Sequence, residues 1–196
     1  MSAVRTLTLA DVAWPRVGFL RDTLLVLAAS VATALAAQVA VPFAWTPVPL
    51  TGQTFAVLLS GAVLGARLGF IAQVVYLLEG GLGLPLFAGG ATGVVKLVGP
   101  TGGYLMAFPF AAALTGFLAE RGWDRRFLTT FGALLLGSAV IFAFGLLWLA
   151  RFLPAQQLLT SGLLPFIPGD LLKSGLASAA FPAAWSWVDR RRGKDA

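Results

Sequence analysis

The chain has no cysteine and no histidine, and only 11% of its 196 residues are charged. Without cysteine, a disulfide framework, a thiolate metal site and a cysteine nucleophile are excluded. Without histidine, the commonest general base and metal ligand is missing, so hydrolytic and metal-dependent chemistry are not expected. A soluble domain carries about 25% charged residues, whereas 58% of this chain is hydrophobic. The composition therefore predicts a protein embedded in membrane lipid.

The net charge of +6 raises nucleic acid as a possible partner. The arginines are scattered between apolar stretches, however, which is typical of membrane topology, and we expect no nucleic-acid partner. A signal peptide is not expected either. The first apolar run starts near Leu24, after a leader that contains Asp11 and Asp22, and several more runs follow it.

Five apolar runs approach the length of about 20 residues that a helix needs to cross a bilayer. The second run is interrupted at Arg67, which lies between two glycines and favours a turn over a helix in mid-membrane. Splitting this run gives six segments. The five runs are Leu24–Val41, Thr54–Leu78, Tyr104–Ala119, Phe127–Ala150 and Leu171–Val188.

Charge asymmetry supports six segments with both ends of the chain in the cytoplasm. In that topology 11 of the 14 basic residues lie on the cytoplasmic side, as the positive-inside rule expects. We predict an all-α membrane protein with six transmembrane helices in one bundle. Its parts are a cytoplasmic leader (1–23), a membrane domain (24–188) and a basic cytoplasmic tail (189–196). The halves of the second run, 51–64 and 68–78, are short for full spans and predict a tilted or partly re-entrant hairpin.

Three segments rich in proline and glycine fall on the outer side of this topology: 41–53, 79–104 and 165–170. Proline and glycine interrupt regular helix. Irregular backbone near a membrane is tolerated only where it is buried in protein or lines a cavity. We therefore predict irregular outer loops that roof a ligand pocket open to the outside.

Asp170 and Lys173 are the only charged residues between Phe152 and Trp187. A charge deep in a bilayer costs about 3 kcal/mol by insertion scales, so such residues usually face a cavity and have a function. Three positions apart on a helix, they share a face and could present an acceptor and a donor to one ligand. Alternatively, Asp170 caps the helix and Lys173 extends to the interface. Their spacing leaves both interpretations open.

Other candidates have two interpretations as well. Gln53 could donate and accept hydrogen bonds at a ligand or lie at the outer interface. Tyr104 could contact a ligand or belong to an aromatic belt. Glu79 and Lys96 could pair across the second outer segment or be separately solvated. The glycine-rich run at 99–103 lacks the Gly-Lys-Ser/Thr ending of a nucleotide-binding loop, which excludes that function.

Alanine recurs every four residues in the first apolar run, at Ala28, Ala32, Ala36 and Ala40. Small residues at this spacing allow helices to approach closely in lipid. The stripe could pack within the bundle or dock another membrane subunit, and the sequence does not separate the two.

Four blocks together resemble the BioY family, the biotin-binding S component of energy-coupling factor (ECF) transporters. They are PVPLTGQT at 47–54, GLPLFAGG at 83–90, GPTGGY at 99–104 and GDLLK at 169–173. The resemblance covers residues 24 to 188 in the right order. Gly52 departs from it where the family usually has leucine, and Glu79 where a small or apolar residue is common.

The resemblance implies a six-helix vitamin-binding subunit of the bacterial inner membrane. Such subunits act with a transmembrane coupling protein and two cytoplasmic ATPases, so the chain itself would not be an enzyme and would need no cofactor. The resemblance also implies that Ala28, Ala32 and Ala36 belong to the surface that docks on the coupling protein.

Biotin has a ureido ring with one carbonyl and two N–H groups, and a valerate carboxylate. The resemblance places Gln53, Thr51, Asp170 and Lys173 at these polar groups, and apolar or aromatic walls at Phe43, Phe87 and Tyr104. Lys173 could donate to the carbonyl or pair with the carboxylate, Asp170 could accept from a ureido N–H, and Gln53 could satisfy a remaining group. No metal site is expected.

Three alternatives remain: an S component for another vitamin, a biotin transporter that works alone or as an oligomer, and an intramembrane enzyme that uses Asp170 and Lys173 as acid and base. The enzyme is disfavoured because no nucleophile stands beside that pair.

Overall fold

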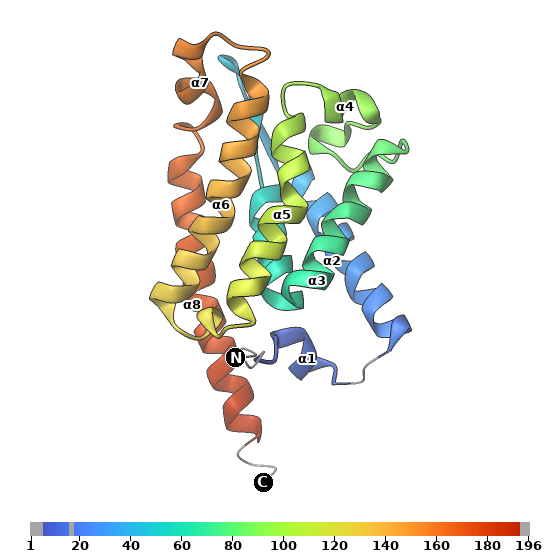
Figure 1. The fold of residues 1–196 in the computed structure, drawn as a ribbon, viewed down its shortest axis with the longest axis vertical. Helices are drawn as coiled ribbons and strands as arrows, with labels where there is room; N and C mark the ends of the chain where they lie inside the picture. Colours follow the sequence, from blue (N-terminus) through green and yellow to red (C-terminus); the bar gives the residue numbers. More distant parts are fainter. Residues whose placement is uncertain (1–5, 16–17, 193–196) are drawn as a thin grey trace, which may run out of the picture.

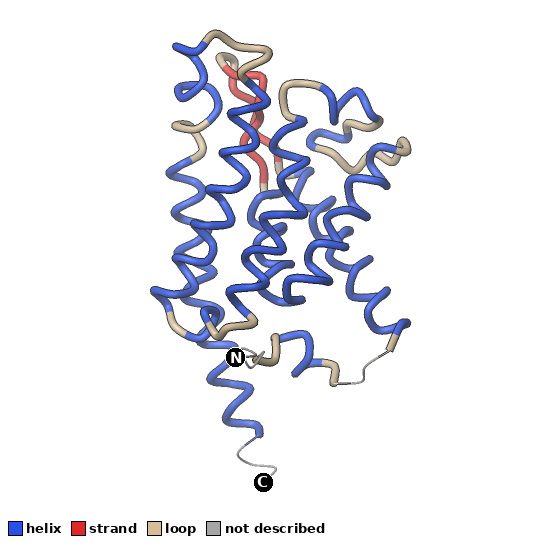
Figure 2. Tube along the Cα trace, in the orientation of Figure 1, coloured by secondary structure: helices blue, strands red, loops and turns tan. Residues whose placement is uncertain are grey.

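The computed structural model describes residues 6–15 and 18–192 and is mostly helical (Figures 1 and 2). Two short strands and two 3-10 turns, Ala88–Gly90 and Trp123–Arg125, complete the regular structure of these residues. The elements are α1 (Leu9–Ala13), α2 (Phe19–Gln38), β1 (Ala40–Phe43), β2 (Thr46–Thr51), α3 (Gln53–Gly81), α4 (Val94–Val98), α5 (Gly102–Ala119), α6 (Phe127–Leu149), α7 (Ala155–Gly162) and α8 (Ile167–Arg192).

Four helices, α2, α3, α5 and α6, are long and apolar enough to cross a membrane. This agrees with the predicted class of multi-pass membrane protein. The 26-residue helix α8 packs beside α6 and includes the fifth apolar run.

Helix α3 is a hairpin of two arms. Gly65 has φ of +84° and ψ of 176°, a conformation that glycine adopts without steric cost. Gln53 donates a hydrogen bond to the hydroxyl of Tyr76, although a straight helix would separate these residues by about 35 Å. Gln73 likewise donates to Ser60 at 2.9 Å. The chain therefore reverses within the interruption that the sequence predicts.

Glycines allow the two arms to pack closely on each other and on α5. A Cβ atom on Gly69 would lie 2.8 Å from the Cα of Gly61, and a Cβ atom on Gly61 would collide with the backbone carbonyl of Ala112. The turn is centred on Gly65, two residues before the predicted break, and leaves Arg67 exposed.

The first outer segment is not irregular, and this expectation was wrong. It forms an antiparallel hairpin in which Ala40 pairs with Thr51 and Val41 with Leu50. Proline is tolerated here because each strand of a two-stranded ribbon has one unpaired edge. The missing N–H groups of Pro47 and Pro49 break no hydrogen bonds along that unpaired edge.

The two ends of the bundle differ. The β-hairpin, α4 and α7 lie at the upper end in Figure 1, and α1 lies with the last turns of α8 at the lower end. At the lower end, Arg21 forms ion pairs with Asp11 of α1 and Asp22 of α2. Trp185 of α8 donates to Asp124, between α5 and α6, at 2.6 Å. These contacts fix the lower end of the bundle.

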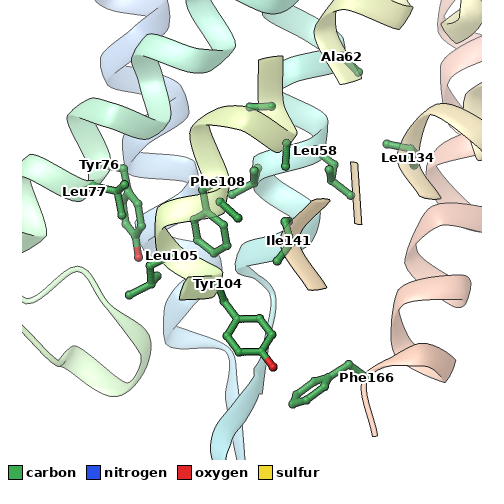
Figure 3. Packing of buried hydrophobic residues seen from close by; sticks show 14 of the residues in the cluster. Leu58, Ala62, Tyr76, Leu77, Tyr104, Leu105, Phe108, Leu134, Ile141 and Phe166 are labelled. Atoms are coloured by element: carbon green, nitrogen blue, oxygen red, sulfur yellow. The ribbon is translucent and has the colours of Figure 1, made fainter. Parts of the chain in front are cut away.

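The hydrophobic core lies between α3, α5 and α6 (Figure 3). Phe108 of α5 stacks on Tyr76 with ring centroids 6.4 Å apart. Tyr104 and Phe166 lie at the edge of this core, where the bundle opens toward the β-hairpin and α4.

Candidate functional site

A cavity lies between the β-hairpin, the first arm of α3, the start of α5, α6 and the start of α8. The empty space between these elements is about 650 Å³ when the part open to solvent is included. The walls are mostly apolar, with a few polar side chains. Apart from Pro49 and Ala88, the lining residues are Val48, Leu50, Thr51, Gln53, Thr54, Phe87, Lys96, Thr101, Tyr104, Leu105, Phe108, Phe142, Phe166, Asp170 and Lys173.

Asp170 and Lys173 both line this cavity. The hydroxyl of Ser138, on α6, donates to the Asp170 carboxylate at 2.8 Å. The Lys173 ammonium donates to the backbone carbonyl of Thr51 at 2.8 Å. Because α8 already begins at Ile167, Asp170 is not its cap, and Lys173 points toward β2 instead of extending along the lipid. The capping and snorkelling interpretation is therefore wrong for this pair.

Gln53 is buried and belongs to a chain of hydrogen bonds. Its carbonyl oxygen accepts from the Thr51 hydroxyl at 3.2 Å, and its amide donates to the Tyr76 hydroxyl. Tyr76 in turn donates to the backbone carbonyl of Leu86 at 3.0 Å. Lys173, Thr51, Gln53 and Tyr76 therefore connect α8, the β-hairpin, both arms of α3 and the loop that follows α3.

Two of the three aromatic residues predicted for the cavity wall line the cavity. Phe87 is fully buried and packs edge-on against Tyr76, with centroids 5.6 Å apart. Tyr104 lines the cavity, and its hydroxyl donates to the carbonyl of Gly162 at 2.8 Å, which ties α5 to the end of α7. Phe43 is different: it stacks on Trp45 in the hairpin, at 5.0 Å, and is not among the residues that line the cavity.

Several lining residues were not predicted. Phe142 and Phe166 lie in apolar sequence that carries no distinguishing signal. Thr101 could have been found, because it lies in the GPTGGY block. Lys96, considered only as a loop charge, is half-buried and lines the cavity. Its suggested partner Glu79 accepts a hydrogen bond from Ser30 instead, and no Glu79–Lys96 ion pair is present among the described residues.

The alanine stripe lies on an open side of α2. Ala28 and Ala32 are exposed and Ala36 is half-buried, while the opposite side of α2 buries Ser30 and Thr33 toward α3. Packing among the described residues therefore does not account for Ala28 and Ala32.

The arrangement provides groups suited to binding a polar ligand. An acid, an amine and an amide face one mostly apolar cavity. In residues 6–15 and 18–192, no group of three or more acidic side chains could hold a metal ion.

Known proteins resemble this chain in sequence and in fold. A model of the BioY family matches residues 5–190. A protein of Pyrococcus horikoshii named "Probable biotin transporter BioY" is 43% identical over 145 residues, which cover 74% of this chain and 84% of that protein. "Biotin transporter BioY" of Rhizobium etli is 35% identical over 81% of this chain and 89% of the relative.

A crystal structure described as the S-component for biotin from an ECF-type ABC transporter has the same fold. Its TM-score is 0.77 and its sequence identity 26%, over 85% of this chain and 92% of that one. These relatives are named as transporters or transporter components, and none of these names describes an enzyme. The family match spans nearly the whole chain and agrees with the four sequence blocks around the cavity, so this protein belongs to the BioY family.

Proposed function

We propose that this chain captures biotin with high affinity as the membrane-embedded substrate-binding subunit of an ECF-type ABC transporter. The observation that carries the proposal is the cavity, where Gln53, Asp170 and Lys173 face apolar and aromatic walls. The printed names of the relatives and of the solved structure supply the identity of the ligand and of the transporter class.

The chemistry of biotin suits these groups. The Asp170 carboxylate accepts from a ureido N–H, the Lys173 ammonium donates to the ureido carbonyl, and the Gln53 amide satisfies a remaining group. The bicyclic ring and aliphatic tail pack on Phe87, Tyr104 and their apolar neighbours. Biotin thereby replaces contacts that these side chains now make with the protein, such as the bond from Lys173 to Thr51.

In the proposed topology, six helical segments cross or enter the membrane, and both ends of the chain face the cytoplasm. The arms of α3, 53–64 and 66–81, are about 18 and 24 Å long, shorter than a hydrocarbon core of about 30 Å. The hairpin is therefore tilted or partly re-entrant. The arginine-rich lower end faces the cytoplasm of a bacterial cell, and the cavity opens outward.

The partners are a transmembrane coupling protein and cytoplasmic ATPases. The coupling protein docks on the open side of α2, where Ala28, Ala32 and Ala36 permit close helix packing. ATP hydrolysis takes place in the partner subunits, and this chain uses no cofactor or metal of its own.

The experiment is biotin binding to the purified protein in detergent, with wild type beside Asp170→Asn and Lys173→Ala. We expect tight binding by wild type and a loss of about tenfold or more in each variant, because a dry site loses a charged hydrogen-bond partner. Arg151→Gln is the matched control: Arg151 is exposed, stacks on Trp148, and does not line the cavity.

Thiamine and riboflavin are tested as competitors, because another vitamin is the nearest alternative. Full binding by both cavity variants would place the site elsewhere. A folded wild type that binds thiamine or riboflavin but not biotin would overturn the biotin assignment and leave the transporter class standing. Uptake in cells that lack the ATPase partners would instead support a stand-alone transporter.

A further inference from the structure

Lys96 lies at the mouth of the cavity. It lines the cavity and also a second, more open hollow beside the β-hairpin, and Pro49, Ala88 and Lys96 line both. It is half-buried, yet it makes no hydrogen bond or ion pair with any described residue. A partly buried ammonium without an anionic partner is available to a ligand.

Thr101 supplies a second, independent observation. It lines the same cavity and is only 8% exposed, yet its hydroxyl oxygen is buried without a hydrogen-bond partner among the described residues. Thr101 precedes α5 at the position where a threonine usually caps the helix, but its side chain makes no capping bond. Buried hydroxyls are normally paired, so an unpaired one beside a cavity indicates that the partner comes from outside the chain.

The two residues belong to one corner of the cavity. Helix α4 ends directly against the start of α5, where a Cβ atom on Gly102 would collide with the carbonyl of Leu97. Gly102 also donates to the carbonyl of Gly99 at 2.9 Å, which closes the turn between the helices. The N-terminus of the 18-residue helix α5 adds a partial positive charge there. An ammonium, a hydroxyl donor and a helix N-terminus together favour an anion.

The polar group formed by Asp170 and Lys173 is less suited to bind the carboxylate of a ligand. Lys173 lies three residues after Asp170 on α8 and already donates to the carbonyl of Thr51. A second carboxylate placed there would face the negative charge of Asp170, and like charges at short distance disfavour each other. Among the described residues, Asp170 on α8 is the one acidic side chain that lines the cavity.

We propose that Lys96 and Thr101 form a carboxylate subsite at the cavity mouth, which holds the acid end of the substrate. This inference rests on the proposed function, biotin capture, and assigns the orientation of the ligand. The valerate carboxylate lies at Lys96, and the ureido ring lies inward at Gln53, Asp170 and Lys173.

The test compares the binding of biotin with that of its neutral carboxamide. Wild type, Lys96→Met, Thr101→Val and the control Arg151→Gln are purified in detergent. Wild type should bind biotin about 10- to 100-fold more tightly than the amide, since a charge-assisted bond is lost with the neutral ligand. Lys96→Met should remove most of this preference by weakening biotin alone. Arg151→Gln should keep it, which separates local contact from the general loss of a positive charge.

Thr101→Val tests the hydroxyl without disturbing the shape of the site. It should weaken biotin about threefold to tenfold and leave the midpoint of thermal unfolding unchanged or higher, because the hydroxyl has no partner inside the protein. A fall of that midpoint in Thr101→Val would show a structural role and contradict the subsite.

The outcomes separate the two proposals. If wild type binds biotin and both variants keep the full preference for the acid over the amide, the subsite is wrong and the proposed function stands. If Lys96→Met weakens biotin and the amide equally, Lys96 does not read the carboxylate, and the subsite is wrong. If folded wild type binds neither ligand, the proposed function fails, and the inference fails with it.

Discussion

The ammonium of Lys173 donates a 2.8 Å hydrogen bond to the backbone carbonyl of Thr51, and so ties the first turns of α8 to the end of the β-hairpin. One turn earlier on α8, Asp170 accepts from Ser138 of α6. The only two charges of this apolar stretch are thus both held by polar groups of neighbouring elements. These two hydrogen bonds hold both side chains at the wall of the cavity.

Ser138→Ala should weaken biotin binding about tenfold, because the Asp170 carboxylate loses the donor that orients it. Ser138 is buried and is not itself a lining residue. Titration calorimetry in detergent measures the effect. Ser178→Ala is the matched control, since Ser178 is equally buried but donates only within its own helix, to the carbonyl of Ser174. Equal affinities of Ser138→Ala and wild type would mean that Asp170 needs no support from α6.

Tyr76→Phe should loosen the loop that follows α3. The Tyr76 hydroxyl accepts from Gln53 and donates to the carbonyl of Leu86, so its removal leaves the buried Gln53 amide and the partly buried Leu86 carbonyl without these partners. The expected cost is about 1–3 kcal/mol of local stability. Hydrogen exchange should accelerate in residues 82–91, and biotin affinity should fall because Phe87 lies in this loop.

Tyr104→Phe is the comparison for this variant. In wild type the Tyr104 hydroxyl donates a hydrogen bond to the carbonyl of Gly162, so its removal should accelerate hydrogen exchange in residues 155–166 instead. If exchange in residues 82–91 is the same in Tyr76→Phe as in wild type, Tyr76 does not hold the loop.

The sequence singled out polar side chains that line the cavity because charges and amides stand out in apolar helices. Asp170, Lys173 and Gln53 were visible for this reason, and the glycines around Arg67 predicted the reversal of α3. Which apolar residues face the cavity depends on how each helix is rotated about its own axis. Helices in lipid are apolar on the lipid side and the core side alike, so no periodicity distinguishes Phe142, which faces the cavity, from its lipid-facing neighbours.

The expectations for Phe43 and Lys96, near the β-hairpin and α4, also differ from the structure. The family resemblance placed Phe43 in the cavity wall, but in the two-stranded hairpin it stacks on Trp45. Lys96 was considered only with Glu79, its neighbour across the loop. In the structure α4 folds against α5 and brings Lys96 to the cavity, a long-range arrangement that local sequence does not specify.

Gly61→Ala should destabilise the bundle by about 1–3 kcal/mol or more. The added methyl group would collide with the backbone of α5 at Ala112, which cannot move as a side chain could. Thermal unfolding in detergent measures the change. Gly175→Ala is the control: a methyl group there meets nothing within 4 Å, so the variant should be as stable as wild type or more so, by about 0.5–1 kcal/mol. Equal midpoints for the two variants would contradict the close packing of α3 on α5.

Ala32→Trp should uncouple transport from binding. Ala32 lies on the open side of α2 and is not among the residues that line the cavity, so biotin binding in detergent should match wild type. Uptake by cells that contain the coupling protein and ATPases should fall about tenfold or more, because a bulky side chain prevents close helix packing. Val31→Trp is the control. Val31 is 55% exposed, and its side chain is turned by about 100° around the helix, away from the stripe. If Ala32→Trp supports normal uptake, or if Val31→Trp reduces uptake equally, the alanine stripe is not the docking surface.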